Sequence, residues 1–169
     1  MTDKHLLILN SQQIQQKIVR IAYQILEDNF EEEEIIIAGI LPSGGRVAER
    51  LKVILDEIAP FESKLVGIQL DKQSSKLEAK IDFDIEECSN KVVVLVDDVL
   101  NSGKTLAYGF GVFLDVPLKK LRTAVLIDRN HKRYPIITDF AGMALSTVLK
   151  EHVEVVLDRD GEEDAVYLK

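Results

Sequence analysis

The segment Val92–Asp98, "VVVLVDD", constrains the fold of this chain more than any other part of the sequence. A run of aliphatic residues without polar alternation is typical of a strand that is covered on both faces, and such strands occur mainly in parallel sheets flanked by helices. Two adjacent carboxylates, Asp97 and Asp98, close this run. An unpaired buried charge is costly, so we expect the pair to face either solvent or a ligand that binds it.

Similar apolar runs recur along the chain and alternate with amphipathic segments. The runs predict further strands at 35–40, 63–70 and 121–128. Apolar residues at helical spacing predict helices at 12–29, 46–58 and 103–116. This alternation indicates an α/β fold with a mostly parallel central sheet flanked by helices.

The C-terminal quarter of the chain has a different character. Segments 134–145, 151–158 and 165–169 resemble short strands that follow one another without helices, which favours an antiparallel edge or a small flap. No repeat or linker separates this part from the rest. We therefore expect one domain over residues 1–169.

Local signals define two of the helix predictions. Ser11 is expected to cap the first helix through its hydroxyl oxygen. Gly109 and Gly111 lower the helix propensity of the segment 103–116. Because glycine has no side chain, we expect these two positions to allow close packing against the sheet.

Composition excludes several classes of protein. No apolar run approaches the ~20 residues that span a bilayer, and the N-terminus lacks the pattern of a secretion signal, so a cytoplasmic protein without membrane contact is expected. The single cysteine, Cys88, indicates a reducing compartment. The formal net charge of −8 disfavours nucleic acid as a partner, although Asp128–Arg133 forms a local basic cluster.

The turn after the doubled carboxylate suggests a binding site for a phosphorylated sugar. Ligands of open α/β sheets lie beyond the carboxyl ends of the strands, which is where Asp97 and Asp98 are expected. The following residues, Ser102–Thr105, begin a helix, whose free N–H groups and partial positive charge suit a phosphate. Carboxylates that accept from sugar hydroxyls would then lie beside donors that bind a phosphate.

This segment has other interpretations. The tetrad "SGKT" is similar to the end of a nucleotide-binding P-loop, but that motif needs a glycine where this chain has Asp98. No G-x-G-x-x-G follows a strand, which argues against a dinucleotide site. A purely structural alternative is that the two carboxylates only end a strand and cap a helix.

The segment Val92–Leu106, "VVVLVDDVLNSGKTL", resembles the phosphoribosyl-pyrophosphate (PRPP) motif of type I phosphoribosyltransferases. The segment Thr123–Leu145 and the early "IIIAGILPSGGRVAERL" are similar to the bifunctional pyrimidine-operon attenuation regulator / uracil phosphoribosyltransferase family. The resemblance covers nearly the whole chain. It implies the type I phosphoribosyltransferase fold, PRPP as substrate, Mg²⁺ as cofactor and a homo-oligomer.

The resemblance also implies roles for individual residues. Asp97 and Asp98 would hold the ribose hydroxyls and contribute to catalysis, and Mg²⁺ would be held mostly by PRPP with Asp97 and Asp98 as its candidate protein ligands. The 5′-phosphate would be bound by a phosphate loop that consists of Asn101, Ser102, Gly103, Lys104 and Thr105. The pyrophosphate loop would consist of Pro42, Ser43, Gly44, Gly45 and Arg46.

Two further roles follow from the same resemblance. Lys72 would close over pyrophosphate as a catalytic cation, and Asp128 and Arg129 would lie near the base. The activity implied is transfer of phosphoribose from PRPP to a nucleobase, with uracil as the first candidate and a purine base as the second.

The chain departs from the family pattern at two cationic positions. Ser43 and Lys72 stand where the family usually has arginines, and lysine lacks the bidentate grip of a guanidinium. Arg46 is a candidate substitute for the first. These departures leave a second hypothesis open: a catalytically weak module that senses PRPP or a nucleoside monophosphate and acts on RNA or a protein partner, with RNA disfavoured by the net charge.

Overall fold

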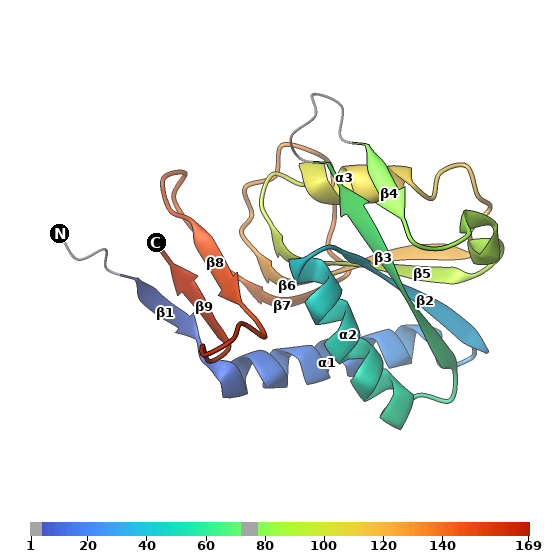
Figure 1. Ribbon diagram of the computed structural model, residues 1–169, viewed down its shortest axis with the longest axis horizontal. Helices are drawn as coiled ribbons and strands as arrows, with labels where there is room; N and C mark the ends of the chain where they lie inside the picture. Colours follow the sequence, from blue (N-terminus) through green and yellow to red (C-terminus); the bar gives the residue numbers. More distant parts are fainter. Residues whose placement is uncertain (1–4, 72–77) are drawn as a thin grey trace.

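A computed structural model of the chain describes residues 5–71 and 78–169. Its main sheet has six strands in the order β4-β3-β2-β5-β6-β7 (Figure 1). All neighbouring strands in it are parallel except β3 and β4. The strand bounds are β2 Glu34–Ile40, β3 Glu62–Leu70, β4 Ala79–Ile81, β5 Val92–Leu100, β6 Lys120–Asp128 and β7 Phe140–Ala144. The predicted α/β class and the mostly parallel sheet are confirmed.

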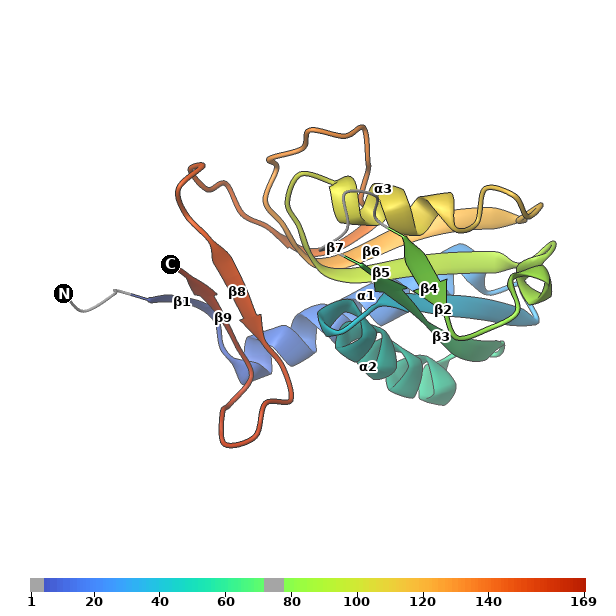
Figure 2. The same cartoon turned by 45° about the horizontal axis from the view of Figure 1, so that its top comes forward.

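Helices cover both faces of the main sheet (Figures 1 and 2). Helices α1 (Ser11–Asn29) and α2 (Ser43–Ile58) pack on one face, and α3 (Lys104–Gly111) packs on the other. A short 3-10 helix, η1 (Ile85–Cys88), precedes β5. Each face therefore has its own apolar core, and the central strands contribute to both.

The ends of the helices differ from the prediction in three places. Asn10, not Ser11, caps α1, because its side-chain oxygen accepts from Gln13 N at 2.9 Å while the Gln13 side chain accepts from Asn10 N. Helix α2 begins at Ser43, so Ser43–Arg46 form its first turn instead of a loop. Helix α3 ends at Gly111 and continues as turns, which shortens the predicted helix.

The two glycines of α3 have different environments. A Cβ on Gly109 would lie 3.1 Å from Ile40 Cδ1 and 3.2 Å from Leu95 Cδ2, so the absence of a side chain there does allow close packing on β2 and β5. A Cβ on Gly111 would meet nothing within 4 Å. The packing prediction is therefore right for Gly109 and wrong for Gly111.

A second sheet, called the small sheet below, has three antiparallel strands in the order β1-β9-β8. Its strands are β1 Leu6–Leu9, β8 Val153–Val156 and β9 Ala165–Leu168. The predicted C-terminal flap is present, but the sequence did not predict that the N-terminal strand β1 joins it. The small sheet lies at the carboxyl-end side of β2 and β5 (Figures 1 and 2). None of the described helices has the length and apolar composition needed to cross a membrane.

Candidate functional site

Strands β2 and β5 are neighbours at the centre of the main sheet, and the chain leaves them in opposite directions. After β2 it enters α2 on one face, and after β5 it enters α3 on the other (Figure 2). A crevice forms where the connections diverge in this way, and ligands of α/β sheets bind there. The loops that follow β2 and β5 are those in which the sequence placed the pyrophosphate and phosphate sites.

Asp97 and Asp98 lie near the end of β5. The strand does not stop at them, because Val99 and Leu100 still pair with β6. Asp97 is only 7% exposed and Asp98 is half-buried. Asp97 Oδ1 accepts from Asp98 N at 2.8 Å, and Asp98 Oδ1 accepts from Val99 N at 2.8 Å. Local backbone donors therefore fix one oxygen of each carboxylate at the crevice.

The predicted phosphate loop has a residue with positive φ at the start of α3. Gly103 has φ +88° and is the N-cap of α3 without a side-chain capping bond, so this position favours glycine. Ser102 Oγ accepts from Lys104 N at 3.2 Å, and Ser102 O accepts from Arg133 N at 2.8 Å and Tyr134 N at 3.0 Å. The loop is thus braced from the segment that follows β6.

One small cavity connects Asp97 to the phosphate loop. It is lined by Asp97, Val99, Leu100, Asn101, Ser102, Gly103, Thr105 and Leu106. Lys104 is exposed and does not line it. A carboxylate, two hydroxyls and the start of a helix therefore surround a single hollow, which brings acceptors and anion-binding donors together.

The first turn of α2 approaches the same place through Gly44. A Cβ on Gly44 would lie 2.6 Å from Val96 O and 2.9 Å from Asp97 Cα, so no side chain fits there. The turn follows a cis peptide bond between Leu41 and Pro42. The sequence placed Gly44 in the pyrophosphate loop but gave no sign that this glycine touches β5. The contact sets the spacing between the two predicted anion sites.

The segment after β6 is braced internally. Asp128 is 6% exposed, and its carboxylate accepts from Asn130 N and Thr138 Oγ1, each at 2.9 Å. Arg129 is 7% exposed and donates to Asn101, Thr147 and the carbonyl of Glu151. Both side chains that the sequence assigned to base binding are therefore engaged with neighbouring segments.

Comparison with known proteins fits this geometry. Residues 7–158 match the family described as Phosphoribosyl transferase domain. The chain belongs to the type I phosphoribosyltransferase family. Because the match includes β2, β5 and both of their loops, this phosphoribosyltransferase has its crevice inside the shared region.

Named relatives extend over almost the whole phosphoribosyltransferase. The Bifunctional protein PyrR of Fusobacterium nucleatum is 35% identical over 99% of this chain and 100% of its own length. That of Clostridium acetobutylicum is 33% identical over 94% of each. Among solved structures, the hypoxanthine phosphoribosyltransferase of Trypanosoma cruzi aligns with a TM-score of 0.77 at 19% identity, covering 96% of this chain and 95% of that one. The hypoxanthine-guanine phosphoribosyltransferase hpt-2 of Bacillus anthracis has a TM-score of 0.70 at 24% identity over 86% and 85%. At these identities the solved structures show the fold alone.

Two predicted residues of the phosphoribosyltransferase need separate comment. Arg46 donates from Nη1 to the Leu157 carbonyl, so its guanidinium is directed toward the small sheet. It lines a cavity there with Ser43 and Arg159. Lys72, the predicted catalytic cation, lies outside the described residues.

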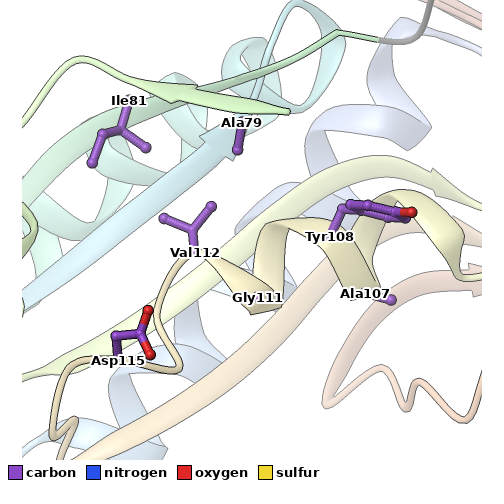
Figure 3. Close-up of a pocket in the computed structure, with 7 residues that line it drawn as sticks. All are labelled: Ala79, Ile81, Ala107, Tyr108, Gly111, Val112 and Asp115. Atoms are coloured by element: carbon purple, nitrogen blue, oxygen red, sulfur yellow. The ribbon is translucent and has the colours of Figure 1, made fainter. Parts of the chain in front are cut away.

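A different hollow of this phosphoribosyltransferase lies between β4 and α3 (Figure 3). Its lining is Ala79, Ile81, Ala107, Tyr108, Gly111, Val112 and Asp115. Among the described residues that line it, Asp115 is the one charged residue, and none is a predicted sugar or phosphate ligand. The described lining therefore contains one side-chain hydroxyl, that of Tyr108, and no cationic side chain that would pair with a phosphate.

Proposed function

We propose that the protein transfers the phosphoribosyl group of PRPP to a nucleobase and releases pyrophosphate. The observation that carries the proposal is the single cavity in which Asp97 lies beside the phosphate loop. A pentose with a 5′-phosphate needs acceptors for its hydroxyls beside donors for its phosphate. Family membership supports the reaction class.

Each part of PRPP has a proposed partner. Asp97 and Asp98 hold the ribose hydroxyls, and 101–105 bind the 5′-phosphate through backbone amides and the hydroxyls of Ser102 and Thr105. The first turn of α2, Ser43–Arg46, presents its N–H groups to pyrophosphate. The segment at Asp128 and Arg129 lies near the base.

The residues present fit a magnesium ion that is held mainly by its substrate. Among the residues that the structure describes, no group of three or more His, Cys, Asp or Glu side chains is placed to hold a metal. Mg²⁺ usually takes one or two carboxylates and completes its shell with substrate phosphates and water, and Asp97 and Asp98 provide such carboxylates. When bound, Mg²⁺ would neutralise charge on the leaving pyrophosphate.

The chemistry needs alignment more than covalent help. The bond from ribose C1 to the pyrophosphate oxygen breaks and its electron pair leaves with pyrophosphate. The lone pair of a base nitrogen forms the new C1–N bond, and the proton of that nitrogen is released. Asp97 and Asp98 hold the sugar in position and offset the positive charge that develops on it.

Uracil is the first candidate base and a purine is the second. The sequence resemblance and the relatives named Bifunctional protein PyrR support a pyrimidine. The solved structures of similar fold are named for hypoxanthine and guanine. The experiment is to incubate the protein with PRPP, Mg²⁺ and each of uracil, hypoxanthine and guanine, and to measure pyrophosphate release. Release with none of the bases would contradict the enzymatic proposal.

The ribose assignment has its own test. The double substitution Asp97→Asn with Asp98→Asn removes both negative charges and should abolish PRPP binding in calorimetry while the far-UV spectrum is retained. The matched control, Asp115→Asn with Glu57→Gln, removes the same charge at exposed positions and should bind PRPP as the parent protein does. Undiminished binding by the first variant would rule out the ribose role.

A second candidate function is a sensor of PRPP or a nucleoside monophosphate that acts on RNA or a protein partner. The orientation of Arg46 favours it, because the guanidinium that could replace the family arginine at position 43 is bonded to the Leu157 carbonyl. Nucleotide binding without turnover, together with salt-sensitive RNA binding, would support the sensor. The expected homo-oligomer is tested in the same preparation by size-exclusion chromatography with light scattering.

A further inference from the structure

Arg129 connects three segments that are distant in the sequence. Its Nη1 donates to Asn101 Oδ1 at 2.8 Å, its Nε to Thr147 Oγ1 at 3.0 Å, and its Nη2 to Glu151 O at 2.6 Å. The first partner lies in the phosphate loop, and the other two lie in the segment that leads into β8. One buried side chain thus joins the phosphate loop to the small sheet.

All three acceptors of this guanidinium are neutral. Among the described residues, no carboxylate forms an ion pair with Arg129, although the residue is only 7% exposed. A buried charge without a counter-ion is costly and is normally paired. The missing negative charge would be supplied by an anion at the phosphate loop, directly beyond Asn101.

The contact also fixes the amide of Asn101. A guanidinium has only donors, so Asn101 must present its oxygen to Arg129 and direct its NH₂ group away. An NH₂ group is what an anion binds, whereas the opposite orientation would present an oxygen to it. Lysine could not replace this arrangement, because a single ammonium lacks the planar fork that reaches three acceptors.

We propose that Arg129 is a positioning residue for the phosphate loop: it orients the Asn101 amide toward the bound phosphate, supplies uncancelled positive charge, and couples phosphate binding to the segment 147–151. The inference rests on the proposed function, since the anion is the 5′-phosphate of a phosphoribosyl compound. It assigns the Arg129 side chain to the phosphate end of the substrate, while the main chain nearby remains the proposed neighbour of the base.

The test is calorimetric binding of ribose 5-phosphate to the full chain, alongside melting temperature. Arg129→Lys and Asn101→Ala should each weaken binding by about tenfold or more, since hydrogen bonds to charged groups are lost. The double variant should bind no worse than the weaker single variant, because both changes disable one device. Independent, multiplying losses, or parent-like affinity of Arg129→Lys, would overturn the proposal.

A matched control separates positioning from general stability. Arg20 also donates to distant main chain, at the carbonyls of Ala141 and Gly142, but it joins α1 to β7 away from the loop. Arg20→Lys should lower the melting temperature without changing the affinity for ribose 5-phosphate. A loss of affinity equal to that of Arg129→Lys would mean that the effect is only structural.

Asn101→Asp keeps the test decisive if Arg129→Lys does not fold. The new carboxylate pairs with Arg129, so the melting temperature should be kept or raised, but the NH₂ donor is lost and the phosphate is repelled. Retained affinity in this variant would overturn the inference. If the parent protein binds ribose 5-phosphate and only these variants fail to behave as stated, the positioning role falls and the proposed function stands; if the parent does not bind, both fall.

Discussion

The two sheets of this protein are held together in different ways. The central strands of the main sheet are fully enclosed: Ile35–Ile40 and Val92–Val96 are buried throughout, with a helix on each face. The small sheet contributes a few residues to one core, including Val153, Val155 and Val166, and is also held by polar contacts from α2 and, through the segment 147–151, by Arg129. The main sheet is therefore enclosed between helices on both faces. The small sheet has a smaller share of the core, so changes at single contacts should weaken its attachment.

The largest effect on stability is expected for Leu95→Ala in the main sheet. Leu95 is fully buried and contacts the position where Gly109 packs, so truncation leaves a cavity. We expect a loss of about 2–5 kcal/mol in the free energy of unfolding, measured with urea. Val155→Ala in the small sheet removes fewer atoms from a site that is 8% exposed, so the loss in the free energy of unfolding should be smaller. Equal losses would contradict the contrast between the two sheets.

The same two variants test the prediction of a single domain. If the two sheets unfold as one unit, tyrosine fluorescence and far-UV circular dichroism will give coincident transitions. A separate early transition in Val155→Ala alone would show that the small sheet unfolds independently.

Gly44→Ala changes the contact between the first turn of α2 and strand β5. The added methyl would lie 2.6 Å from Val96 O, so the first turn of α2 must move away from β5. We expect about 1–3 kcal/mol of destabilisation and weaker PRPP binding, because the spacing of the two anion sites changes. Gly111→Ala is the matched control, since its Cβ would meet nothing within 4 Å. Parent-like PRPP affinity in Gly44→Ala would show that this spacing is not critical.

Arg50→Gln should weaken only the attachment of the small sheet to α2. Arg50 Nη2 lies 2.7 Å from Asp158 Oδ1 and 2.6 Å from Asp164 Oδ2, and its side chain is 20% exposed. Removing this double ion pair should cost about 1 kcal/mol or less and raise hydrogen exchange in β8 and β9. Exchange that rises equally in β2 and β5 would mean that the effect is global.

The smallest effect is expected from Glu154. A hydrogen bond from Lys169, with a second from Arg159, holds the pKa of its carboxyl below the usual value of 4.5. Because the folded pKa is depressed, the stabilisation is present above pH 4.5 and is lost as the pH falls through the folded pKa. Glu154→Gln should therefore lower the melting temperature slightly at neutral pH, and the difference should shrink as the pH falls below 4.5 through the folded pKa. A difference that persists at low pH would exclude this linkage.

The main sheet was predictable from the sequence, and the small sheet was predictable only in part. Uninterrupted aliphatic runs such as 35–40 and 92–96 predict buried parallel strands, because they are short for a buried helix and rich in β-branched residues. The strand β1 has no such signal: Leu6–Leu9 is short, half of it is exposed, and its pairing with β9 spans the whole chain. Long-range pairing of short strands is not encoded in any local pattern.

The candidate site divides along the same line. The phosphate loop and the carboxylates were recognisable because they form one continuous motif. The contact of Gly44 with β5 and the three bonds of Arg129 join segments that lie far apart in sequence, so spacing could not reveal them. The notable signals were residue types: a second glycine beside Gly45 and an arginine directly after the predicted strand 121–128.

The pairing of β1 with β9 has a consequence for biosynthesis. Translation proceeds from the N-terminus, and every strand of the main sheet precedes β8 and β9 in the chain. The strands of the main sheet are thus synthesised before β9, the partner of β1, is available. Thr147 and Glu151 follow β7 in the chain, so a nascent chain that has already made its parallel strands still lacks two of the three acceptors of Arg129. Arg129 can therefore complete its bonds to Thr147 and Glu151 only after every strand of the main sheet has been synthesised.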